Sequence, residues 1–216
     1  VCFTFSYTEL ACAIPKAGGA FDYAHRAFGE NIGFFGGMAQ NIEFIFAPPA
    51  IAYAIGAYLV NWFPDLGITP IAIIAYGIFT GINIIGVKTA AIFELVVTII
   101  AVFELLLFAG ITLPHFEIVN ITANPLPNGY SGIFAAIPFA IWFFLAIEGV
   151  ANVAEETINP QRNVLIGFGS AIVTLVILCL LTFTSAVGVN GWESIVYEVG
   201  SSSPSDSPLP LALAHI

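Results

Sequence analysis

The sequence predicts an all-α integral membrane protein, and three observations carry that prediction. Hydrophobic residues make up 59% of the 216 residues, whereas charged residues make up only 8%, a composition far outside that of soluble domains. Mean hydropathy is +0.97. The apolar residues form separate runs, several of which reach the roughly 20 residues that an α-helix needs to cross a bilayer.

The apolar runs predict the helices in chain order. Helices are expected at residues 1–14, 31–61, 68–86, 89–113, 131–156 and 164–189, with another starting near 209. The first is too short to span, and the second is long enough to cross with a tilt. Because the chain starts and ends inside apolar runs, we expect residues 1–216 to form a single transmembrane domain truncated from a longer membrane protein. A Ser/Pro-rich stretch at residues 200–208 predicts a mobile loop, and residues 191–199 before it predict a short surface helix.

The basic residues predict the orientation of these helices. Lys16 and Arg26 lie in the first gap between runs, Lys88 lies in the third and Arg162 in the fifth. The second, fourth and sixth gaps contain no Lys or Arg. Positive charge is enriched on the cytoplasmic side of membrane proteins. The loops predicted to be cytoplasmic are therefore those at residues 15–30, 86–90 and 157–163.

Composition and motif content exclude several function classes. The net charge of −10 reflects scarce Lys and Arg, so the chain lacks the positive charge that binds a nucleic-acid backbone. The sequence contains no zinc-protease, serine-hydrolase or phosphate-loop motif, which makes an enzyme the weak alternative. No cofactor or metal ion is expected, because the cysteines and histidines show neither paired nor metal-ligand spacing; these are Cys2, Cys12, Cys179, His25, His115 and His215.

Glu43 lies in the middle of the run at residues 31–61. Mostly small residues recur at helical spacings around it and would let another helix approach closely; these neighbours are Gly36, Ala39, Gln40, Ala47, Ala50 and Ala54. Glu43 is therefore predicted to face the interior of the bundle rather than lipid. A glutamate hydrogen-bonded to a neighbouring helix for structure alone is the alternative, but acids inside the membrane typically mark transport paths.

Glu148 interrupts the run at residues 131–156, at a depth where a carboxylate costs about 2.5–3.5 kcal/mol on insertion scales. Pro138, Gly149 and Asn152 also weaken this helix. Irregular backbone at membrane depth is tolerated only where it lines a cavity or is buried in protein, and secondary transporters bind substrate and ions at such breaks. The run therefore predicts a broken helix with a binding site, although an ordinary helix with one buried glutamate fits the same residues.

No Lys or Arg lies inside any predicted span, so none is available there to neutralise Glu43, Glu104 or Glu148. Each acid must be protonated, be hydrogen-bonded, meet a cation that comes and goes, or meet a residue outside the chain. Two of these states correspond to proton coupling and to binding of a cationic substrate. Glu104 is the weaker candidate because bulky residues surround it at helical spacing, namely Ile100, Leu107 and Phe108.

Three motifs, in this order, resemble the amino acid–polyamine–organocation permeases. Residues 5–29 read FSYTELACAIPKAGGAFDYAHRAFG and are similar to the end of the second helix and the cytoplasmic turn of that family. Residues 82–91 read INIIGVKTAA and resemble its junction between helices four and five. Residues 143–164 read FFLAIEGVANVAEETINPQRNV and resemble its sixth helix and the loop that follows. The resemblance covers nearly the whole chain, and the two acids make it most like the ethanolamine permeases.

The resemblance implies an inverted-repeat transporter bundle of five plus five helices, of which residues 1–216 supply the end of helix two through the start of helix eight. It implies that the broken sixth helix lines the substrate site. The substrate-binding residues carried over are Trp142, Phe143, Phe144, Leu145, Ala146, Ile147, Glu148 and Glu43. Among these, Trp142 matches an aromatic residue that covers substrate in related exchangers, and Glu43 and Glu148 are the proton-coupling candidates. Ala101 stands where some relatives carry a lysine, so a lysine-substituted ion site is in doubt.

We therefore expect a secondary active transporter of a small amine or amino acid, working by alternating access with proton coupling or exchange. Its expected location is the bacterial inner (plasma) membrane. Ethanolamine is the leading substrate, because its ammonium suits the extra acids and it lacks the carboxylate that helix N-termini favour. The alternatives are a zwitterionic amino acid permease or exchanger, and a non-transporting receptor on the same fold. The expected partners are the substrate, the lipid bilayer and protons, with no nucleic acid.

Overall fold

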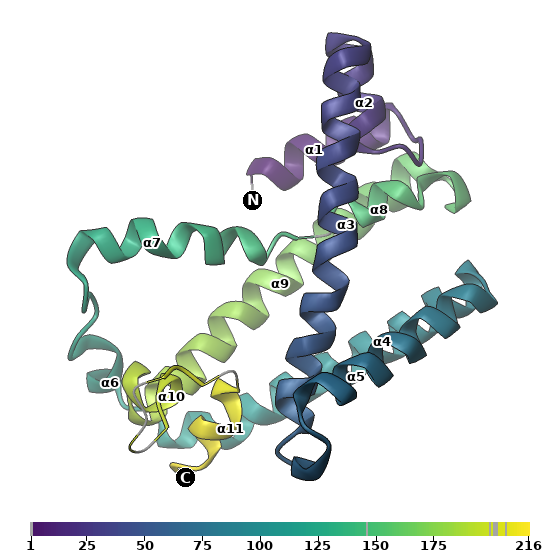
Figure 1. Cartoon of the computed structure of the whole chain (residues 1–216). Helices are drawn as coiled ribbons and strands as arrows, with labels where there is room; N and C mark the ends of the chain where they lie inside the picture. The colour runs from purple at the N-terminus through teal and green to yellow at the C-terminus, as the bar shows by residue number, and fades with distance from the viewer. Residues whose placement is uncertain (1, 146, 199, 201–202, 206) are drawn as a thin grey trace. The chain divides into compact units, whose positions relative to one another are not determined.

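A computed structural model describes residues 2–145, 147–198, 200, 203–205 and 207–216. Within these residues the chain is helical, with one isolated β-bridge between Tyr197 and Pro204 and no strand. The α-helices (Figure 1) are α1 (Cys2–Ala13), α2 (Ala20–Phe28), α3 (Glu30–Leu59), α4 (Ile68–Ile85), α5 (Val87–Thr112), α6 (Ile118–Thr122), α7 (Gly129–Trp142), α8 (Gly149–Asn152), α9 (Pro160–Asn190), α10 (Trp192–Val196) and α11 (Pro208–Leu213). Three short 3₁₀ turns lie at Pro64–Leu66, Leu113–His115 and Ala154–Glu156.

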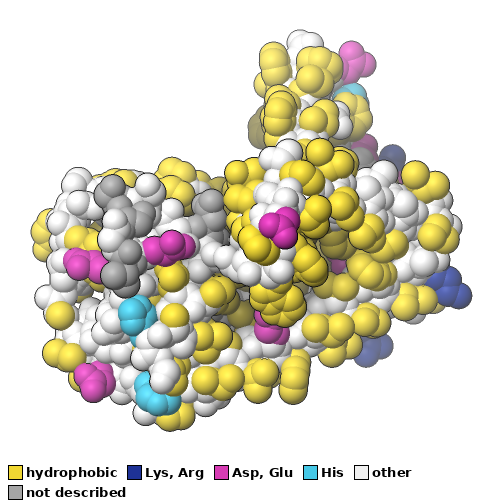
Figure 2. All heavy atoms as spheres, turned by 60° about the horizontal axis from the view of Figure 1, so that its bottom comes forward, with side chains coloured by type: hydrophobic (Ala, Val, Ile, Leu, Met, Phe, Trp, Pro, Cys, Tyr) yellow, Lys and Arg dark blue, Asp and Glu magenta, His cyan; other side chains and the backbone are white. Residues whose placement is uncertain are grey.

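The all-α membrane class is confirmed. Four of the described helices are long and apolar enough to cross a bilayer, namely Glu30–Leu59, Ile68–Ile85, Val87–His115 and Pro160–Asn190. Their large apolar side chains are mostly exposed, and Figure 2 shows hydrophobic side chains over much of the face that it presents. Exposed apolar surface on this scale fits helices that lie against lipid or against further helices, because a soluble protein would bury it.

The chain divides into two compact units. One comprises Val1–Ala47 and Asn128–Ile177, and the other comprises Pro48–Pro127 and Leu178–Ile216. Two long helices, α3 and α9, therefore each contribute a part to both units. The single transmembrane domain expected over residues 1–216 stays a prediction.

The first unit is built around Tyr7 of α1. Its core joins α1, α2, α8, the turn after α8 and the first half of α9, and consists of Tyr7, Ala11, Tyr23, Ala151, Ala154, Val164 and Phe168. The rings of Tyr7 and Tyr23 meet edge to face, with centroids 5.3 Å apart, in the arrangement that aromatic pairs favour. Ala11 and Ala151 are fully buried, which lets the helix backbones approach closely.

Helix α2 lies inside the segment at residues 15–30 that was predicted only as a cytoplasmic loop. It spans 9 residues, too few to register as an apolar run. Tyr23 is its buried anchor, and the charges agree with the helix dipole, with Asp22 in the first turn and Arg26 in the last. Gly19 precedes it with a φ of 51°, a left-handed conformation that favours glycine.

The second unit contains the hairpin of α4 and α5, which lie side by side (Figure 1) and are joined at Gly86 with a φ of 132°. Phe79 and Phe93 hold the pair together with ring centroids 5.8 Å apart. A second core forms where α5, α9, α10 and α11 meet; its residues are Phe108, Ala186, Val187, Ile195 and Ala212. Helix α10 confirms the short helix expected within residues 191–199. Residue 199 lies outside the described residues, as do residues 201, 202 and 206 of the Ser/Pro-rich segment.

Candidate functional site

The helix that carries Glu148 is broken, as predicted. Helix α7 ends at Trp142 and α8 begins at Gly149. Between them the described backbone turns through bonds of 3₁₀ type, with the N–H of Leu145 donating to the carbonyl of Trp142 at 3.2 Å. Such tight turns are typical of functional interruptions in helices. The break places the side chains that follow α7 around a cavity.

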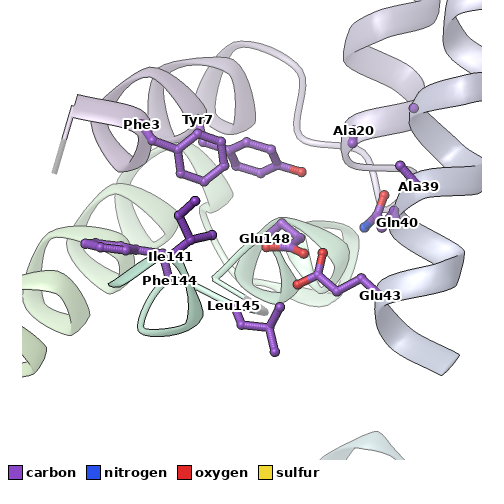
Figure 3. Close-up of a pocket in the computed structure, with 11 residues that line it drawn as sticks. Phe3, Tyr7, Ala20, Ala39, Gln40, Glu43, Ile141, Phe144, Leu145 and Glu148 are labelled. Carbon is purple, nitrogen blue, oxygen red and sulfur yellow. The ribbon is translucent and has the colours of Figure 1, made fainter. Parts of the chain in front are cut away.

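The cavity of the first unit has a volume of about 590 Å³, which lies within the range of ligand-binding pockets. Helix α1 contributes Phe3 and Tyr7, while α3 contributes Glu43 and Gln40 beside Gly36 and Ala39. Helix α2 contributes Ala20 at its start. Helix α7 and the break contribute the remaining described residues of the wall (Figure 3), which are Ile141, Phe144, Leu145 and Glu148.

Glu43 and Glu148 approach each other from opposite walls of this cavity. Their carboxyl groups point toward one another in Figure 3 and lie close enough to interact. Glu148 is buried, with 8% of its surface exposed. A hydrogen bond between two carboxyl groups needs a proton on one of them, because an ionised carboxylate is an acceptor only. The pair can therefore share one proton, as facing carboxylates do in other sites.

A second polar contact closes one side of the cavity. The Nε2 atom of Gln40 on α3 donates to Oδ1 of Asn152 on α8 at 3.0 Å. Gly19 packs against both side chains: a Cβ atom there would lie 2.8 Å from Asn152 Oδ1 and 3.2 Å from Gln40 Nε2. The segment before α2 is thus seated directly on the contact between α3 and α8.

Two further contacts join α1 and the segment after it to the 3₁₀ turn that follows α8 and to the start of α9. The backbone N–H of Ala17 donates to the Glu155 carboxylate at 3.2 Å. The Cys12 thiol donates to the carbonyl of Gln161 at 3.4 Å. All of these partners belong to the first unit.

The structure distributes the eight predicted substrate-binding residues unevenly. Glu43, Phe144, Leu145 and Glu148 line the cavity. Trp142 and Phe143 do not line it and have about half of their surface exposed, and Ile147 packs against the core of the first unit. Ala146 lies outside the described residues. The substrate-binding role remains a prediction for all eight, and so does the proton-coupling role for Glu43 and Glu148.

Sequence reasoning missed Tyr7 and the pairing of Gln40 with Asn152. Tyr7 lies one helical turn from Ala11, and both are buried. The sequence of an apolar helix does not indicate which of its faces lines a cavity, so this position of Tyr7 could not be predicted. Gln40 and Asn152 are 112 residues apart, so only the fold brings them together. Glu104 lies in the second unit, is exposed and does not line this cavity.

Metal-binding clusters are absent from the part of the chain that the structure describes, since nowhere there do three or more His, Cys, Asp or Glu residues lie together. The described site consists instead of a carboxyl pair, a tyrosine, a glutamine and apolar side chains. Apolar helices that frame a cavity at a broken helix are the arrangement in which secondary transporters place their binding sites.

The chain belongs to the amino acid permease family, whose model matches residues 1–213. Members of this family are transporters rather than enzymes, and the family lies in the superfamily that the sequence motifs resemble. The match spans both compact units. It agrees with a cavity that is built from side chains on several helices instead of from a catalytic cluster.

Similar curated proteins carry the names of transporters. An uncharacterized transporter of Rhizobium meliloti (strain 1021) is 28% identical over 203 residues, which cover 89% of this chain and 43% of the relative. Cationic amino acid transporter 1 of Arabidopsis thaliana is 30% identical over 199 residues, covering 83% and 33%. The branched-chain amino acid permease of Bacillus subtilis (strain 168) is 24% identical over 204 residues, covering 85% and 44%. The chain thus spans less than half the length of these relatives, and no solved structure matches it significantly.

Proposed function

We propose that this chain forms the central part of a secondary transporter that carries a small amine or amino acid, with ethanolamine as the leading substrate. The observation that carries the proposal is the facing pair of Glu43 and Glu148 in a cavity at the helix break. An ammonium group has three donors and no acceptor, and carboxylate oxygens are its natural partners. Hydrogen bonds between ionised groups are about twice as strong as neutral ones.

The shared proton suggests how binding is coupled to proton movement. While the cavity is empty, one proton holds the two carboxyl groups together. An arriving ammonium replaces that proton, because its N–H groups can donate to both carboxyl groups at once. The proton then leaves on the side from which the substrate came, and the reverse exchange occurs after the cavity opens to the other side. The aromatic ring of Phe144 on the cavity wall adds a cation–π surface for the ammonium.

We further propose that the basic loops at residues 15–30, 86–90 and 157–163 are cytoplasmic and that the membrane is a bacterial inner membrane. The support is the positive charge of these loops, since Lys16, Arg26, Lys88 and Arg162 are all exposed. In this orientation, the contact between Gln40 and Asn152 lies between the carboxyl pair and the cytoplasmic loop at residues 15–30, to which Gly19 belongs. That contact then acts as part of the inner barrier of the alternating-access cycle.

A second candidate is a larger substrate, namely a cationic or zwitterionic amino acid. The cavity volume of about 590 Å³ favours it, because ethanolamine would fill only a small part of a space typical of drug-sized ligands. The names of the relatives point the same way, since they include cationic amino acid transporters and a branched-chain amino acid permease. A receptor that binds substrate without moving it is the remaining alternative.

The test is uptake by the full-length protein in proteoliposomes, with labelled ethanolamine, lysine and leucine offered separately. We expect ethanolamine uptake that falls about 10-fold or more in Glu43→Gln and in Glu148→Gln, because each change removes a charged hydrogen-bond acceptor. Glu104→Gln is the matched control, since it removes a glutamate from a span without touching the cavity. Undiminished ethanolamine uptake in both cavity variants at every pH would refute the role of the pair. Preference for lysine or leucine would favour the second candidate, and binding without counterflow would favour a receptor.

A further inference from the structure

The hydroxyl group of Tyr7 is buried in the wall of the cavity without a hydrogen-bond partner. Only 8% of the Tyr7 surface is exposed, and among the described residues its oxygen meets no partner in hydrogen-bond geometry. The backbone of Ala20 approaches that oxygen, but only as a possible donor to it, so the hydroxyl hydrogen stays unused. A buried hydroxyl whose hydrogen has no acceptor is costly, so a ligand oxygen beside it would be stabilising.

The ring of Tyr7 is held rigidly, so its hydroxyl cannot turn away to find a partner. Three aromatic rings surround it, with centroid distances of 5.3 Å to Tyr23, 5.8 Å to Phe3 and 6.1 Å to Phe168. Packing on several sides locks the rotamer of a side chain and aims its polar end in one direction. Figure 3 shows the Tyr7 hydroxyl reaching across the cavity toward the wall that carries Gln40.

No described neighbour accepts the hydrogen of the hydroxyl. Gly19 packs beside it, since a Cβ atom there would lie 3.2 Å from the Tyr7 oxygen. The nearby Gln40 amide is engaged with Asn152. Tyr7 lines the same cavity as Glu43 and Glu148. The cavity lining therefore combines two carboxyl groups with a hydroxyl donor.

We propose that Tyr7 is a specificity-determining residue whose hydroxyl donates to an oxygen atom of the substrate while Glu43 and Glu148 hold its ammonium. This inference rests on the proposed transport function and adds to it the chemical class of the second group recognised. That group is an oxygen acceptor, either a hydroxyl or a carboxylate. A site that hydrogen-bonds a substrate oxygen discriminates strongly against the analogue that lacks it, because its own polar group is then left unpaired.

The experiment compares matched pairs of amines that differ in that oxygen. Inhibition constants are measured on the full-length protein in proteoliposomes for ethanolamine against ethylamine, and for lysine against cadaverine. The first pair differs by a hydroxyl and the second by a carboxylate. If the site recognises a hydroxyl, we expect ethanolamine to bind Tyr7→Phe about 3- to 10-fold more weakly than it binds the wild type. If the site recognises a carboxylate, we expect lysine to bind the variant at least about 10-fold more weakly. The oxygen-free member should bind as in the wild type.

Tyr23→Phe is the matched control. Tyr23 belongs to the same aromatic cluster and also has a buried hydroxyl without a described hydrogen-bond partner, but it does not line the cavity. Its loss should leave both affinity ratios unchanged. An unchanged ratio in Tyr7→Phe would overturn the inference alone, and so would an equal loss for both members of each pair, which indicates disturbed packing. Failure of the wild-type protein to bind any of the four amines would overturn the proposed function and this inference with it.

Discussion

Gln40 on α3 and Asn152 on α8 are joined by a hydrogen bond of 3.0 Å from Nε2 to Oδ1, and Gly19 packs against both side chains. Three segments that are far apart in the sequence thus converge on one polar contact. Gln40 also lines the cavity that holds Glu43 and Glu148, so the contact ties one cavity-lining residue of α3 to α8.

We expect Gly19→Ala to destabilise the full-length protein by about 1–3 kcal/mol, because alanine at a positive φ is strained and its Cβ would collide with Asn152 at 2.8 Å. The measurement is the unfolding midpoint of detergent-solubilised protein. Gly29→Ala is the control for strain alone, since Gly29 has a φ of 87° with nothing within 4 Å of the added Cβ. Equal destabilisation by the two changes would show that the close packing of Gly19 has no energetic weight.

The Gln40–Asn152 bond should appear as a coupling in a double-mutant cycle. We expect Gln40→Ala and Asn152→Ala to be non-additive by about 0.5–1.5 kcal/mol, the usual net contribution of a neutral hydrogen bond. Unfolding free energies of the two single variants and the double variant supply the cycle. Strict additivity would mean that the two amides contribute to stability independently of each other.

Glu155→Gln should loosen the segment before α2, because the Glu155 carboxylate accepts the backbone N–H of Ala17 at 3.2 Å. A neutral amide accepts a weaker hydrogen bond than a carboxylate does. We expect faster amide hydrogen exchange at Ala17. Glu156→Gln, a change at the exposed neighbouring residue, should leave that exchange rate as it is. If both variants exchange alike, the contact does not persist in solution.

Tyr23 should make stability depend on pH in the alkaline range. Burial, followed by the nearby Asp22 carboxylate, raises the pKa of Tyr23 from its usual value of 10.0 to about 12. Between those values the unfolded chain has lost a proton that the folded protein retains, so stability falls as pH rises through this window. Unfolding midpoints measured from pH 9 to pH 12 should fall less steeply in Tyr23→Phe than in the wild type. Tyr130→Phe, at a residue that is 78% exposed, should leave the slope unchanged; a wild-type slope in Tyr23→Phe would contradict the prediction.

Much of the architecture was predictable from the sequence because membrane helices are encoded by length and composition. The long run predicted at residues 31–61 became Glu30–Leu59, and the run at 164–189 became Pro160–Asn190. The helix break was predictable because Glu148 and Gly149 oppose a continuous apolar helix. These signals are local, so no knowledge of the partner helices was needed.

The remaining features depend on contacts between distant segments. Helix α2 escaped prediction because 9 residues cannot form a span. The half-exposure of Trp142 and Phe143 could not be foreseen, because the turn that starts at residue 143 directs successive side chains away from a regular helical stripe. The position of Tyr7 on the cavity wall requires the packing of Tyr23 and Phe168 from two other helices.

The proton that we propose Glu43 and Glu148 share has a consequence for energetics across the membrane. Moving one elementary charge against a potential of 100 mV costs about 2.3 kcal/mol. If one ammonium replaces one proton in the pair, the empty and loaded forms of the site carry the same net charge. The membrane voltage would then do no work on the exchange, and transport would be driven only by the concentration gradients of the amine and the proton.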